Sequence, residues 1–172
     1  MVYLIIILRF LHILSGIFWV GFALMITFYI SPAVQATQES GQKFFSYLLQ
    51  HTNLGKFITV TALVSVLAGF SLYWINSNGF QSDWMKSGPG LGFGLGAVAA
   101  LLGLHYGLLQ NKRSKAMIQL GQKIQAQGSP PTDEQRKSIQ KLQTQLKTGG
   151  KLNAIFLLLA SILMATARFW VF

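Results

Sequence analysis

Four apolar runs divide this chain, and each is long enough to cross a lipid bilayer as a single helix. They cover residues 3–30, 55–75, 90–110 and 152–172. Hydrophobic residues make up 52% of the chain and charged residues only 10%, which is too little charge to cover a soluble surface. The sequence therefore predicts an all-α integral membrane protein, a bundle of four transmembrane helices in a single domain over residues 1–172.

The positive charge is concentrated in the connection between the third and fourth runs. Loops rich in lysine and arginine stay on the cytoplasmic side of a membrane. This connection is therefore predicted to be cytoplasmic and both termini to lie outside, in the inner (plasma) membrane of a bacterium. The net charge of +10 then fits contact with anionic lipid rather than with nucleic acid. The basic residues are Lys112, Arg113, Lys115, Lys123, Arg136, Lys137, Lys141, Lys147 and Lys151, against Asp133 and Glu134.

Two polar connections carry apolar residues at helical spacing. Residues 38–51 suit an amphipathic helix on the cytoplasmic surface. Residues 112–148 suit a cytoplasmic helical hairpin that extends the third and fourth spans, with Thr132 and Gln135 resembling a capping box at the start of its second arm. We expect Pro32 to end the first helix and the Gly149–Gly150 pair to interrupt the second arm.

Small residues form a stripe along the third run. Gly92, Gly96 and Ala100 are spaced four residues apart, so they share one face of a helix. In a phosphate-binding loop the glycines are followed by Lys and then Ser or Thr, and no such pair follows the glycines here. The stripe therefore predicts close packing between helices in lipid.

Polar residues inside the first and last runs form the candidate functional site. Arg9, His12 and Trp19 lie on one face of the first helix, and Met164 and Arg168 lie on one face of the last. The predicted topology brings both arginines into the outer leaflet, with His12 and Met164 about one turn deeper. Because a charge in hydrocarbon costs at least about 2.5 kcal/mol on insertion scales, these residues are predicted to face the protein interior.

Three interpretations of this arrangement are open. In the first, both arginines extend to the outer headgroups and His12 makes one hydrogen bond. In the second, His12 ligates the iron of haem b and Arg9 and Arg168 pair with the propionates. In the third, His12 and Met164 hold copper(I). His105 is a further candidate metal ligand, but it lies about 10 Å or more deeper than His12, so hydrogen bonding within the bundle is preferred. The chain has no cysteine, which excludes thiolate ligands and disulfides.

Two stretches carry a resemblance to known families. Residues 8–21 (Leu-Arg-Phe-Leu-His-Ile-Leu-Ser-Gly-Ile-Phe-Trp-Val-Gly) resemble the first helix of a group of bacterial membrane proteins. The group includes the membrane domain of copper-resistance D proteins, the HemJ-type protoporphyrinogen oxidases and a family of uncharacterised four-helix proteins. The stretch from Met164 to Phe169 is similar to the closing motif of that last family. The resemblance implies a helical bundle with His12 as the candidate ligand, of haem b in the HemJ-type proteins. Those proteins also use a lysine deep in a later helix, whereas Lys56 here only opens the second run.

The residues and the resemblance together lead to one functional expectation. The chain is predicted to bind haem b near the outer face and to act in electron transfer or as an accessory redox subunit, with other membrane redox proteins as partners. The alternative is a non-enzymatic copper-handling or accessory membrane protein whose polar residues are structural. A homo-oligomer is compatible with either, and the sequence assigns no catalytic residue.

Overall fold

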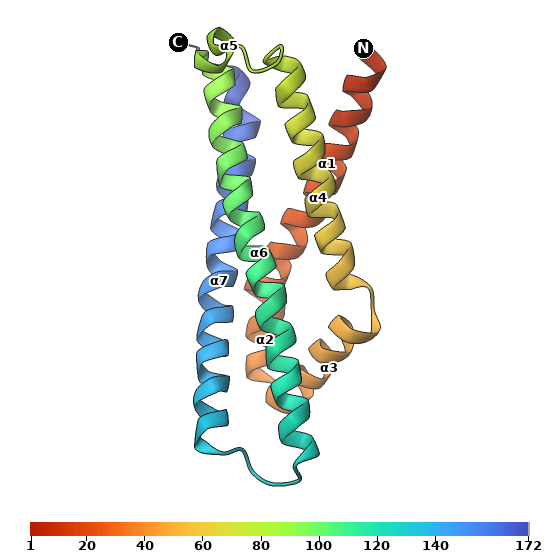
Figure 1. Ribbon diagram of the computed structural model, residues 1–172, viewed down its shortest axis with the longest axis vertical. Helices are drawn as coiled ribbons and strands as arrows, with labels where there is room; N and C mark the ends of the chain where they lie inside the picture. The colour runs from red at the N-terminus through yellow and green to blue at the C-terminus, as the bar shows by residue number, and fades with distance from the viewer. Residues whose placement is uncertain (172) are drawn as a thin grey trace.

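The computed structural model describes residues 1–171, and their regular elements are all helical. The four longest helices are α1 (Val2–Met25), α4 (Leu54–Asn76), α6 (Gly88–Ala126) and α7 (Asp133–Thr166). They run alternately down and up, with both termini and the short α5 (Ser82–Lys86) at one end and the α6–α7 turn at the other (Figure 1). Each belongs to a helical segment long and apolar enough to span a membrane, which confirms the predicted four apolar helices. Phe172, the last residue of the predicted fourth span, lies outside the described residues.

The first helix is longer than predicted. After α1 the chain continues through a π-helical turn, η1 (Ile26–Ile30), into α2 (Ser31–Ala36). The expectation that Pro32 ends the helix is therefore wrong. Pro32 lies in the first turn of α2, where a missing N–H is tolerated, and the wider turn of η1 precedes it. The predicted amphipathic helix over 38–51 is confirmed as α3 (Gln38–His51).

A helical hairpin links the last two spans, as the sequence predicts. Its arms are the second half of α6 and the first half of α7, and α6 is about 58 Å long, nearly twice the hydrocarbon thickness. The capping box is confirmed: the N–H of Gln135 donates to Thr132 Oγ1 at 3.3 Å, and the N–H of Thr132 donates to Gln135 Oε1 at 2.9 Å.

The paired glycines do not interrupt the second arm, so that expectation is wrong. Gly149 and Gly150 are buried inside a continuous α7. A Cβ at Gly149 would lie 2.8 Å from Arg113 Nη1, and one at Gly150 would lie 3.0 Å from Gln110 Nε2. The two glycines therefore let α6 approach α7 rather than breaking the helix.

The helices associate as two close pairs, α1 with α4 and α6 with α7. The pairs meet in a small core of Trp19, Ala23, Ala62 and Leu157. Within the second pair, a Cβ at Gly92 would lie 2.7 Å from Ala167 Cβ, and one at Gly96 would lie 2.7 Å from Met164 Cγ. The glycine stripe is thus a close-packing surface, as predicted. The termini-side half of α1 contacts chiefly α4 and leans away from α6 and α7 (Figure 1).

Candidate functional site

His12 joins α1 to α4. Its Nδ1 lies 2.8 Å from the backbone oxygen of Ser65, and the Ser65 hydroxyl donates to the backbone oxygen of His12 at 3.1 Å. Because a carbonyl oxygen only accepts, the hydrogen bond to Ser65 places the ring proton on Nδ1. Hydrogen bonds in both directions therefore connect the two helices at one level.

Glycine on α4 makes room for the imidazole. A Cβ at Gly69, one turn after Ser65, would lie 2.8 Å from His12 Cε1 and 2.9 Å from Nδ1. On α1, a Cβ at Gly16 would lie 3.2 Å from Ser65 Oγ. The ring is therefore half-buried in a slot made by small residues, with Nε2 making no hydrogen bond to the described chain.

The two candidate arginines lie at the same end of the molecule but are both exposed. Arg9 is on the outer surface of α1, and Arg168 is in the 3₁₀ turn η2 (Ala167–Phe169) that follows α7. Neither guanidinium has a hydrogen bond or ion pair to another described residue. The ion pair that the described residues do form is Lys43 Nζ to Glu39 Oε1 at 2.7 Å, on α3. Any anion paired with Arg9 or Arg168 must therefore come from outside the described chain.

The remaining predicted site residues belong to different parts of the bundle. Met164 packs against Gly96 in the α6–α7 pair, whereas His12 packs against α4. Trp19 is buried in the core where the pairs meet. His105 is exposed on α6, with its ring 5.6 Å from that of Tyr106. His12 and Met164 therefore make their contacts in different helix pairs.

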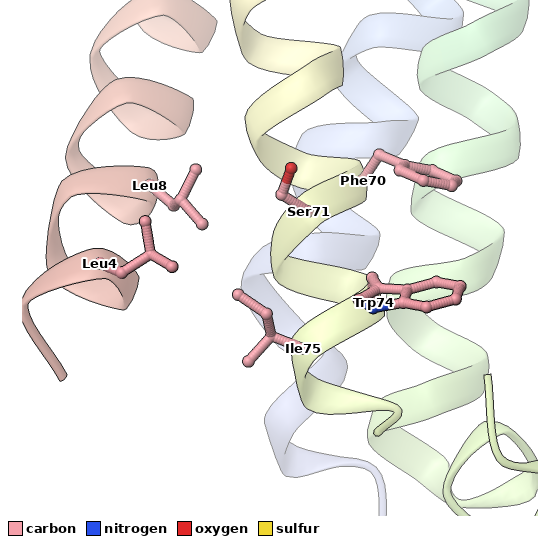
Figure 2. A pocket seen from close by; sticks show the side chains of 6 residues that line it. All are labelled: Leu4, Leu8, Phe70, Ser71, Trp74 and Ile75. Carbon is pink, nitrogen blue, oxygen red and sulfur yellow. The ribbon is translucent and has the colours of Figure 1, made fainter. Parts of the chain in front are cut away.

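A cleft between α1 and α4 lies on the termini side of His12. Its volume is about 290 Å³. Figure 2 shows Leu4 and Leu8 of α1 facing Ser71 and Ile75 of α4 across the opening. Phe70 and Trp74 complete the lining, in which no side chain is titratable. The cleft can therefore hold apolar groups but offers no charge to an ionic substrate.

Several polar residues in the spans escaped the sequence analysis. Ser65 and Gly69 could have been noticed as small residues one turn apart, but their pairing with His12 depends on the register of two helices. Asn153 lies in the apolar part of α7, where its buried Oδ1 has no hydrogen-bond partner, and the same holds for Gln110 Oε1 on α6. For Asn153 and Gln110, the sequence signal is a polar residue inside or at the end of an apolar run.

Within residues 1–171, no group of three or more His, Cys, Asp or Glu side chains is placed to hold a metal ion. The chain matches no family model, no curated protein and no solved structure. The resemblance to the copper-resistance D and HemJ-type proteins therefore stays a prediction.

Proposed function

We propose that the chain is a non-enzymatic accessory subunit of a bacterial inner membrane, which binds a partner protein through the exposed face of α6. The observation that carries the proposal is the outward-facing His105. Unlike His12, this imidazole has no hydrogen-bond partner in the described chain. Four residues around it on the same face are exposed and apolar: Val98, Leu101, Leu102 and Leu108.

An unpaired imidazole that faces hydrocarbon is unfavourable, because lipid chains cannot accept or donate a hydrogen bond. A neighbouring transmembrane helix that presents a hydrogen-bonding side chain would remove that cost. Such interhelical bonds stabilise association by about 0.6–2 kcal/mol in membranes. The partner is therefore a membrane protein, with a polar side chain opposite His105.

Site-specific photocrosslinking in native membranes tests this proposal. A photoreactive residue at Leu102, one turn from His105, is expected to give a discrete adduct that His105→Leu abolishes. The matched position is Leu67 on α4, which is also apolar and exposed but lies on another face. Equal adducts from both positions, or an adduct at Leu102 that survives His105→Leu, would contradict a partner surface on α6.

The proposed topology places the α6–α7 hairpin in the cytoplasm and both termini outside. It is supported by the basic residues along the hairpin and by Trp74 and Trp84 near the opposite end, where tryptophans mark a membrane interface. The chain has no cysteine, so single cysteines can report accessibility. In intact cells, a membrane-impermeant maleimide should label Gln81→Cys and leave Ser129→Cys unlabelled until lysis. The opposite pattern would reverse the topology.

A second candidate function, haem b binding at His12, is favoured by the orientation of the ring. Histidines that bind metals generally donate one ring N–H to a carbonyl or carboxylate, and His12 donates Nδ1–H to Ser65. The free Nε2 would be the iron ligand, while Arg9 and Arg168 would pair with propionates. Haem would supply one-electron transfer. Copper(I) held by His12 and Met164 stays a prediction, because the contacts of these two residues are to different helices.

A further inference from the structure

A second cleft lies between α6 and α7, on the hairpin side of the bundle, and its volume is about 270 Å³. It differs from the cleft beside α1 because a charged residue lies in its lining. Arg113 supplies the charge, and Tyr106, Thr144 and Thr148 carry hydroxyl groups. Gln145, Gly149 and Leu152 complete the lining.

Arg113 is held in place but keeps free donors. Its Nη1 donates to the backbone oxygen of Gln145 at 3.1 Å, so the half-buried guanidinium is anchored to α7. Gly149 allows this approach, because a Cβ there would lie 2.8 Å from Nη1. A guanidinium has five N–H donors, and the others make no hydrogen bond to the described chain. They are available to an anion, to which a guanidinium binds in a bidentate manner.

No carboxylate among residues 1–171 forms an ion pair with Arg113. The chain has four acidic residues, of which Asp133 and Glu134 are nearest in sequence to the residues that line the cleft. They lie ten or more residues before Thr144 on α7, which corresponds to about 15 Å along the helix. Lys141 and Lys151, a turn from the lining threonines on α7, add further positive charge. The positive charge of the cleft is therefore unpaired within the described residues, which leaves it free for an anionic ligand.

The position of the cleft identifies the class of ligand. The apolar part of α6 ends near Gln110 and that of α7 begins near Leu152, so Arg113 and Thr148 lie at the depth where a bilayer changes from hydrocarbon to headgroups. Basic clefts between transmembrane helices at this depth bind anionic headgroups. We propose that the cleft binds the phosphate of an anionic phospholipid through Arg113. The inference requires membrane insertion of the helices, but neither the α6 partner nor a haem.

Lipid retention by the full-length protein tests this proposal. Three proteins are compared: the parent, Arg113→Gln and Arg136→Gln. Each is extracted in mild detergent and exchanged into the same detergent containing phosphatidylglycerol or phosphatidylcholine. Native mass spectrometry then measures the bound lipid. Arg136 is a matched control because it is an exposed arginine at the far end of the hairpin. Phosphatidylglycerol should bind the parent and the Arg136 variant equally well. It should bind the Arg113 variant about tenfold more weakly, which corresponds to about 1.4 kcal/mol, because the charged hydrogen-bond donor is lost.

A second cleft variant distinguishes loss of lipid binding from loss of folding in Arg113→Gln. Thr148→Phe fills the cleft from an exposed position and keeps the guanidinium, and it should lower phosphatidylglycerol binding to the same extent while the helical circular dichroism is unchanged. Equal retention of the two lipids by the parent would overturn the proposal, as would unchanged retention in both cleft variants. Displacement of phosphatidylglycerol by millimolar inorganic phosphate would overturn the lipid assignment in favour of a free phosphate.

Discussion

Gly92→Leu is expected to destabilise the bundle by about 3 kcal/mol, the upper part of the usual range for overpacking. A Cβ at residue 92 would lie 2.9 Å from the backbone Cα of Ala167, and the backbone cannot rotate away as a side chain can. The contact of α6 with η2, directly after α7, must therefore open. Gly96→Leu should cost less, because its nearest neighbour is the flexible side chain of Met164. Reversible unfolding by a denaturing detergent measures both effects.

The control for this substitution is Gly21→Leu. Gly21 also lies in an apolar span, but a Cβ there would meet no atom within 4 Å. The added leucine should leave the free energy of unfolding within about 0.5 kcal/mol of the parent, as for substitutions away from packed contacts. Equal stability of Gly92→Leu and Gly21→Leu would show that α6 does not pack on α7 through the glycine stripe.

His12→Ala is expected to destabilise the protein by about 2 kcal/mol. It removes the Nδ1–H donor to Ser65 and leaves empty the slot beside Gly69. An interhelical hydrogen bond in a membrane contributes about 0.6–2 kcal/mol, and the lost packing adds to it. The same unfolding assay measures the effect. His51→Ala is the matched control, because His51 is exposed on α3 and its ring stacks on Tyr47 of the same helix, not on another helix. It should change stability by about 0.5 kcal/mol, the lower end for an aromatic pair.

The four spans could be predicted from the sequence because hydrophobic length alone decides them. Helix pairing could not, because it depends on which faces meet. Three residues advance a helix by about 300°, so Arg9 and His12 point about 60° apart. That difference suffices for His12 to face Ser65 while Arg9 stays exposed. Two residues on the same helix face can therefore have different neighbours, and the shared face predicted for Arg9 and His12 does not imply a shared contact.

The predictions for glycine and proline residues also differ in outcome, and the reason is again tertiary packing. The prediction that Gly96 packs against another helix is confirmed, because small residues spaced four apart favour close helix packing in lipid. Local propensity predicts that Pro32 and Gly149 break their helices. The structure keeps both inside helical segments, because a π-helical turn precedes Pro32 and the α6 side chains need the space at Gly149. Tertiary packing overrides propensity at both positions.

A non-enzymatic accessory role, which is the central claim, requires that His12 holds α1 to α4 and carries no haem iron. The most direct test is the dithionite-reduced absorption spectrum of the protein purified from haem-replete bacterial membranes, measured beside that of His12→Ala. We predict that the parent shows no Soret or α band above the level of the variant. A Soret band and an α band that are present in the parent and absent from His12→Ala would contradict the claim and assign His12 as a haem ligand.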